Sequence, residues 1–175
     1  MKLEKGLVQV YTGNGKGKTS AAFGLALRAV GRGLKVYIVQ FIKGGFDYGE
    51  LYITDKLPGL TLKTYGRGRF ISEKSPDKVD VELARDALKK AQEVVKKSDV
   101  DVLILDEINV ALSLKLINID EVLELIRKKP EQMELVLTGR KAPVEIVQAA
   151  DLVTEMIEIK HPYNSGFKAR KGIEY

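Results

Sequence analysis

Residues 12–20 read TGNGKGKTS, a glycine-rich run that ends in a lysine and two hydroxyl side chains. Such runs form loops whose backbone N–H groups surround phosphate oxygens, and we expect positive φ at Gly13, Gly15 and Gly17. In the pattern G-x-x-x-x-G-K-[ST], the lysine supplies a movable positive charge and the hydroxyl can bind Mg²⁺. The run matches this pattern at its end, although Thr12 stands where the first glycine is expected. We therefore predict a nucleotide site, and its loop contacts are Gly13, Asn14, Gly15, Lys16, Gly17, Lys18, Thr19 and Ser20.

Two neighbouring carboxylates, Asp106 and Glu107, directly follow the apolar run VLIL at residues 102–105. One of these carboxylates can hold Mg²⁺, directly or through water, beside the hydroxyl of Thr19. An acidic pair at a strand end can instead cap a neighbouring helix. Because a phosphate loop is present, we favour the metal interpretation. The predicted metal ligands are Thr19, Asp106 and Glu107.

Other polar residues give weaker signals. Lys43, Arg67, Arg69 and Arg140 are each candidates for contacts with an anion, and Arg140 is included among the predicted nucleotide contacts. His161 is the sole histidine and is given no catalytic role, since a lone histidine is most often structural. No Ser–His–acid set is indicated.

The elements that position these residues alternate in type. Six apolar runs predict strands and are separated by helical patterns, so the fold class is α/β, with a mostly parallel sheet of about six strands and helices on both faces. This is the P-loop NTPase (RecA-like) architecture, in which ligands bind beyond the carboxyl ends of the strands. The expected strands are 6–12, 35–41, 61–65, 100–107, 135–139 and 152–159, and the expected helices are 19–30, 50–56 (short), 77–97, 119–129 and 143–150.

Length and composition limit the alternatives. A chain of 175 residues predicts a single domain, 1–175. It has no cysteine, which excludes disulfides and Cys-type zinc sites. We see no apolar run long enough to cross a bilayer and no signal peptide, so a cytoplasmic location is the default expectation. A formal net charge of +5 suits an anionic partner, which is either a nucleotide or a nucleic acid.

Four strings resemble one known family, the P-loop corrinoid adenosyltransferases, which act on cob(I)alamin or cob(I)yrinic acid a,c-diamide. They are residues 10–44, which contain GNGKGKT, then VLILDEIN (102–109), VLTGRKAP (136–143) and the tail VTEMIEIKHPYNSGFKARKGIEY (153–175). The loop and the tail together are far more specific than a generic phosphate loop. Thr12 before the first glycine also looks normal for that family.

The resemblance implies transfer of the 5′-deoxyadenosyl group from ATP to the Co(I) of a reduced corrinoid, with release of triphosphate, in adenosylcobalamin biosynthesis or salvage. It implies ATP as co-substrate with Mg²⁺ or Mn²⁺, and a homodimer. It suggests a flavoprotein reductant as a further partner. It leads us to expect no haem, flavin or zinc cofactor, no nucleic acid partner and no membrane partner. Lys18, Thr19 and Glu107 are then the expected catalytic residues, because the leaving triphosphate must be neutralised.

The corrinoid side rests on fewer residues. Relatives place aromatic side chains after the third strand, where they displace the lower ligand of cobalt. This chain has Gly68-Arg69-Phe70-Ile71 there and contains no tryptophan. The expected corrinoid contacts are Phe70, Arg69 and Tyr65. There is no D-x-H-x-x-G motif, so a histidine from the protein is not expected to bind cobalt.

Three other functions share a phosphate loop. A RecA-like ATPase acting on nucleic acid fits the loop, the acidic pair and the basic charge, although no surface combining aromatic and basic residues is evident. A nucleotide kinase of the thymidine-kinase kind often carries a Cys-based zinc site, which this chain lacks. A non-enzymatic ATP-binding switch module is the remaining alternative.

Overall fold

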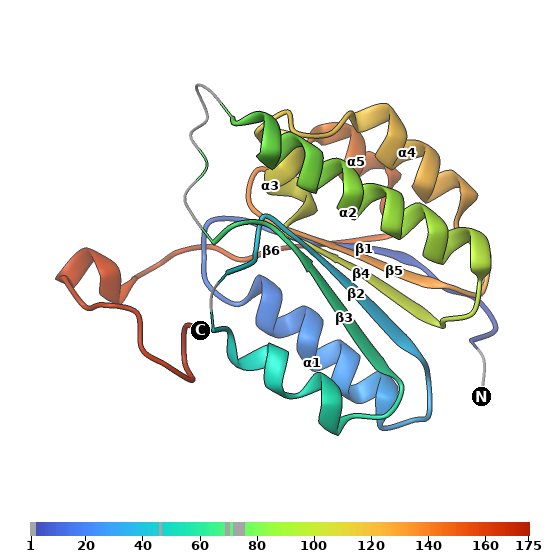
Figure 1. Ribbon diagram of the computed structural model, residues 1–175, viewed down its shortest axis with the longest axis horizontal. Helices are drawn as coiled ribbons and strands as arrows, with labels where there is room; N and C mark the ends of the chain where they lie inside the picture. Colours follow the sequence, from blue (N-terminus) through green and yellow to red (C-terminus); the bar gives the residue numbers. More distant parts are fainter. Residues whose placement is uncertain (1–2, 46, 69–70, 72–75) are drawn as a thin grey trace.

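The computed structural model describes residues 3–45, 47–68, 71 and 76–175. These residues build one six-stranded sheet in the order β3-β2-β4-β5-β1-β6 (Figure 1). Every neighbouring pair is parallel, so the predicted α/β class is confirmed and the sheet is more regular than expected. The strands are β1 (Val8–Thr12), β2 (Val36–Phe41), β3 (Leu60–Tyr65), β4 (Val102–Asp106), β5 (Glu134–Thr138) and β6 (Leu152–Glu155).

Helices cover both faces of the sheet. Helix α1 (Lys18–Val30) lies on one face, and α2 (Lys78–Lys97), α3 (Ile108–Ser113), α4 (Ile119–Lys128) and α5 (Val144–Ala149) lie on the other (Figure 1). Three short 3₁₀ helices complete the described elements, at Gly49–Tyr52, Thr54–Lys56 and Pro162–Ser165. None of the helices in the described ranges is both long enough and apolar enough to span a membrane.

The hydrophobic pattern explains this layering. Every residue of β4 is buried, as its unbroken apolar run predicts for a central parallel strand. Helix α2 buries one stripe, including Ala84, Ala91 and Val95, against the sheet, while its other face carries charge. Two core clusters result, a larger one beneath α2–α5 and a smaller one beneath α1. The sheet lies between these clusters, and because its strands are all parallel, their six carboxyl ends meet at one edge.

Several elements differ from the sequence-based expectations. Helix α3 was not predicted, because its six residues are too few to show a helical period. Strand β6 ends at Glu155 rather than at residue 159; it lies at the edge of the sheet, pairs with β1 alone, and has all four residues exposed. The short helix expected over 50–56 is two separate 3₁₀ turns.

Candidate functional site

The phosphate loop lies between the end of β1 and the start of α1. Gly13 and Gly17 have φ values of 93° and 120°, as expected for inward-facing N–H groups. Gly15 is different, because its φ is not in the left-handed region and the prediction there was wrong. A side chain at Gly15 would instead meet the carbonyl oxygen of Ile157 at 2.8 Å. Glycine is needed at this position for close backbone packing.

Thr12 occupies the place of the first glycine for a structural reason. Its hydroxyl accepts a hydrogen bond from the backbone N–H of Ala142 at 3.3 Å, which ties the loop to the segment after β5. Its carbonyl accepts from the N–H of Met156 at 2.9 Å. The loop is thus anchored on two sides at its first residue, and a glycine could make only the second of these contacts.

Lys18 and Thr19 begin α1 and face the carboxyl edge of the sheet. Lys18 is only 7% exposed, and its ammonium donates to the carbonyl of Gly15 at 2.7 Å. Burial lowers the pKa of Lys18, and the carboxylate of Glu107 opposes that shift. A phosphate oxygen can replace the loop carbonyl as the partner of this ammonium, which matches the role predicted for Lys18.

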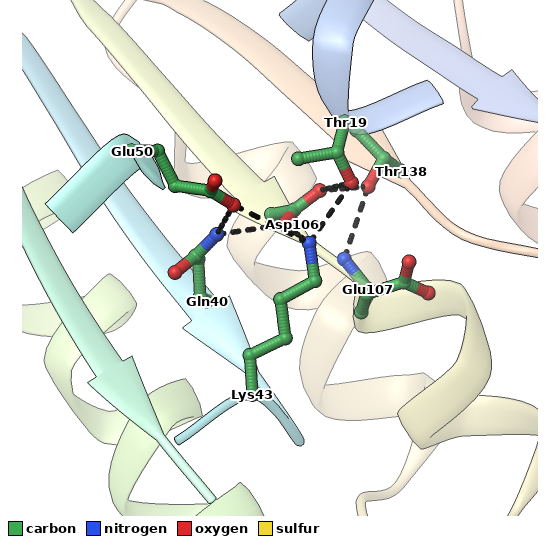
Figure 2. A network of polar contacts seen from close by, with 7 residues as sticks. All are labelled: Thr19, Gln40, Lys43, Glu50, Asp106, Glu107 and Thr138. Carbon is green, nitrogen blue, oxygen red and sulfur yellow. Dashed lines mark hydrogen bonds and ion pairs between the residues drawn. The ribbon is translucent and has the colours of Figure 1, made fainter. Parts of the chain in front are cut away.

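Asp106 is the centre of a polar network beneath the loop (Figure 2). Its carboxylate is fully buried at the end of β4. One oxygen, Oδ1, accepts from the hydroxyls of Thr19 at 2.9 Å and Thr138 at 2.7 Å. The other, Oδ2, accepts from the ammonium of Lys43 at 2.9 Å and the amide of Gln40 at 3.2 Å. The structure therefore brings Thr19 and Asp106 together, as the metal prediction requires.

Glu107 follows Asp106 at a sharp turn between β4 and α3. Its φ of 63° turns the chain, and its N–H donates to the hydroxyl of Thr138 at 3.0 Å. Burial raises the pKa of the Glu107 carboxyl, and the neighbouring charge of Asp106 raises it further. A bound cation would offset both effects. The two carboxylates thus sit at different depths, with Asp106 beneath the loop and Glu107 at the cavity.

Lys43 was considered only as a weak anion contact, yet it lies in the network. The chain turns sharply after β2, with φ of 67° at Ile42, and this turn places Lys43 beside Asp106. Burial acts to lower the pKa of Lys43, but the charge and hydrogen bond of Asp106 outweigh it, so the pKa is raised. Lys43 therefore remains a cation at neutral pH.

A cavity of about 460 Å³ opens above this network. It is large enough for a small ligand. The predicted contacts Lys16 to Ser20, Glu107 and Arg140 all line it, whereas Gly13 and Asn14 do not. The full lining comes from the phosphate loop (residues 15–20), the segment after β2 (Lys43 and residues 48–50), the exits of β4 and β5 (Glu107 and Arg140) and the end of the chain (His161 and residues 172–175).

The end of the chain folds back onto the phosphate loop. The ammonium of Lys16 donates to the carbonyl of Ile173 at 3.0 Å and to the carboxylate of Glu174 at 2.8 Å. Arg170 also binds Glu174, and hydrogen bonds from Arg170 and Lys16 lower the pKa of Glu174 to about 2. Lys171 pairs with Asp47 at 3.0 Å. The tail that was singled out in the sequence therefore forms one wall of the cavity.

The residues predicted for the corrinoid are not assembled at this cavity by the described part of the chain. Tyr65, at the end of β3, packs against the core cluster beneath α2 and does not line the cavity. Arg69 and Phe70 lie outside the described residues. Their roles stay predictions.

Two signals could have revealed more of the site. Gln40 is a polar residue in a run that otherwise reads as a buried strand, VYIVQF, and such a residue needs a partner. Thr138 ends β5 as Asp106 ends β4, so both had to meet at one edge. The contact between Lys16 and the tail has no local signal, because it joins residues 158 positions apart.

Comparisons with known proteins show which sequences this chain is similar to. A sequence model of a family described as ATP:corrinoid adenosyltransferase BtuR/CobO/CobP matches residues 4–175. A corrinoid adenosyltransferase of Sinorhizobium sp. is 41% identical over 98% of this chain and 81% of its own length. One of Pseudomonas aeruginosa is 40% identical over 98% of this chain and 85% of its own. One of Escherichia coli K12 is 36% identical over 98% and 87%, respectively.

Proposed function

This chain belongs to the ATP:corrinoid adenosyltransferase family, and from that premise we propose that the cavity above the phosphate loop is where it performs the reaction. The chain is a transferase that moves the adenosyl group of ATP to a reduced corrinoid in cobalamin biosynthesis. The RecA-like ATPase and the switch module gain no support from the comparisons. The observation that carries the assignment of the site is the convergence of Lys18, Thr19 and Asp106 beneath one cavity.

The chemistry fits the side chains that are present. The electron pair of Co(I) forms the cobalt–carbon bond at the ribose C5′, the C5′–O bond breaks, and triphosphate leaves with that bond's electron pair. No proton has to be removed from the nucleophile, so no general base is required. What the protein must supply is positive charge and N–H donors around the triphosphate. Lys18 and Arg140, together with the N–H groups of the loop, are proposed to supply them.

The residues also fit a divalent metal, Mg²⁺ or Mn²⁺. The hydroxyl of Thr19 and the carboxylate of Asp106 lie within hydrogen-bond distance of each other, and such oxygens are what Mg²⁺ prefers. The carboxylate of Glu107 points away from this pair (Figure 2), and Glu107 lines the cavity. Lys43 already places a cation against two of these oxygens, which shows that the group accepts positive charge. When bound, the ion neutralises charge on the leaving triphosphate. Among the described residues, no group of three or more His, Cys, Asp or Glu side chains is placed to hold a metal ion.

Further proposals follow from the resemblance of the sequence. We propose that the chain is a single domain, acts as a homodimer in the cytoplasm, has a flavoprotein reductant as a further partner, and has no nucleic acid or membrane partner. Phe70 and Arg69, with Tyr65, remain the proposed corrinoid contacts. Of these three residues, Tyr65 has the least structural support as a corrinoid contact, because its side chain packs against the core beneath α2 and does not line the cavity.

The reaction is tested directly by incubating the protein with ATP, Mg²⁺ and chemically reduced cobalamin. We expect the spectrum of an adenosylated corrinoid and one triphosphate for each corrinoid converted. A reaction without enzyme and one with Co(II) cobalamin serve as controls. Release of ADP and phosphate with an unchanged corrinoid would refute the proposal.

The tail gives a separate prediction. Removing residues 172–175 is expected to raise the KM for ATP by less than about tenfold. These residues form one wall of the cavity and hold Lys16 of the phosphate loop, but interactions between exposed charges are weak. The melting temperature should not change, since these residues lie on the surface and outside the core. Steady-state kinetics and thermal denaturation measure both. An unchanged KM would show that the tail does not form part of the ATP site.

A further inference from the structure

The ammonium of Lys43 lies between two of the residues that are proposed to bind the metal ion. Its ammonium lies 2.9 Å from Oδ2 of Asp106 and 3.1 Å from Oγ1 of Thr19 (Figure 2). Glu50 lies 3.9 Å away on another side, and the ring of Tyr48 lies with its centroid 5.5 Å from the same nitrogen. The Lys43 side chain is only 16% exposed. An ordered cation is therefore held between two of the three proposed metal ligands.

The same oxygens cannot serve an ammonium and a divalent ion at once. The ammonium contacts Oδ2 of Asp106 and Oγ1 of Thr19. An ion that bound these same two oxygens at the usual Mg–O distance of about 2.0–2.1 Å would collide with the ammonium. Asp106 cannot remain without a counter-charge, because a fully buried carboxylate is costly unless it is paired. One cation has to replace the other.

We propose that Lys43 is a positioning residue that keeps the metal site occupied by its own ammonium until a divalent ion displaces it. This inference rests on the proposed metal-binding role of Thr19 and Asp106. The nucleotide-free protein then binds divalent ions weakly, and the metal enters together with the triphosphate.

The structure also indicates where the displaced ammonium goes. Lys43, Tyr48 and Glu50 all line the cavity above the phosphate loop. Lysine has a flexible side chain, and a short rotation moves its charge from Asp106 into the cavity. There the ammonium meets the phosphates whose arrival brings the metal. The site therefore holds the ammonium alone without nucleotide. When the triphosphate is bound, it holds both the divalent ion, at Asp106, and the displaced ammonium, in the cavity.

The test measures Mn²⁺ binding to the nucleotide-free protein by electron paramagnetic resonance. Lys43→Met removes the ammonium and should tighten Mn²⁺ binding at least about tenfold, because a competing charge a few ångströms away is gone. Lys43→Gln can keep hydrogen bonds to Asp106 and Thr19 without the charge, and it provides a second variant if Lys43→Met does not fold. In both, Mn²⁺ should raise the melting temperature more than in the wild type.

Two further variants sharpen the result. Lys16→Met is the matched control, because it removes an ammonium from the same cavity that pairs with Glu174 instead of Asp106. It should leave Mn²⁺ affinity within about twofold of wild type, since exposed charges are screened by solvent. Adding Asp106→Asn to Lys43→Gln should abolish the gain, which assigns the gained site to Asp106.

The outcomes separate this inference from the function itself. Unchanged Mn²⁺ affinity in folded Lys43 variants would overturn the exchange, and so would an equal gain in Lys16→Met or a gain that survives Asp106→Asn. Adenosyl transfer by the wild type is measured independently with reduced cobalamin. A wild type that transfers adenosyl while the Lys43 variants gain no Mn²⁺ affinity would refute the exchange alone.

Discussion

Replacing Lys18 by alanine is expected to lower kcat/KM for ATP by roughly 10- to 150-fold, because a hydrogen bond from a charged donor contributes about 1.5–3 kcal/mol and each 1.4 kcal/mol is tenfold. The loss should be greater in kcat than in KM if the ammonium binds the triphosphate more strongly as it leaves. The fold should survive, because among the described residues the hydrogen bond of this ammonium goes to the carbonyl of Gly15 within its own loop. Steady-state kinetics with reduced cobalamin measure the effect.

The matched control for this variant is Lys56→Ala. Lys56 is exposed at the end of a 3₁₀ helix and does not line the cavity. The Lys56→Ala variant lowers the net charge by the same amount as Lys18→Ala. It therefore measures how far the net charge alone changes kcat/KM for the trianionic or tetra-anionic ATP. Equal kinetics for wild type and Lys18→Ala would show that triphosphate is held elsewhere.

The sequence predicted the layout of the sheet because that layout depends on local patterns. Apolar runs such as VLIL are buried on both faces wherever they occur in a parallel sheet, and helix α2 repeats its apolar residues at helical spacing. Gly17, Lys18 and Thr19 were identified because their order and spacing are themselves the signal. Thr19 and Asp106 could be placed together by topology, since parallel strands end at one edge.

The rest depended on contacts that no local pattern encodes. Lys43 is one of 29 lysines and arginines, and only the turn at Ile42 brings it to Asp106. Glu174 reaches Lys16 because the chain beyond β6 folds back over the loop. Gly15 is a further example. The sequence predicts a glycine there because of a positive φ, but the structure requires glycine because the backbone of Ile157 packs too closely for a side chain. Such contacts follow from the assembled chain.

Asp106→Asn is expected to lower the free energy of unfolding by about 3 kcal/mol, the lower end of the range for breaking a buried ion pair. The lower end applies because Lys43 keeps Glu50 at 3.9 Å as a second, weaker partner. The loss corresponds to a fall of about 6–12 °C in melting temperature for a chain of this size. Denaturant titration measures the free energy of unfolding. Asp55→Asn, at an exposed position, should stay within about 0.5 kcal/mol of wild type.

A double-mutant cycle distinguishes the charge from the hydrogen bonds. The asparagine oxygen can still accept from Lys43 and Gln40, and its amide can donate to the hydroxyls of Thr19 and Thr138, so the main loss is the negative charge. If so, Lys43→Gln combined with Asp106→Asn should cost less than the sum of the two single changes, because the double variant leaves neither charge buried alone. Additive costs would mean that Asp106 stabilises the fold through its hydrogen bonds. The cation exchange proposed for Lys43 would then lose its electrostatic basis, since that exchange requires Asp106 to demand a positive charge.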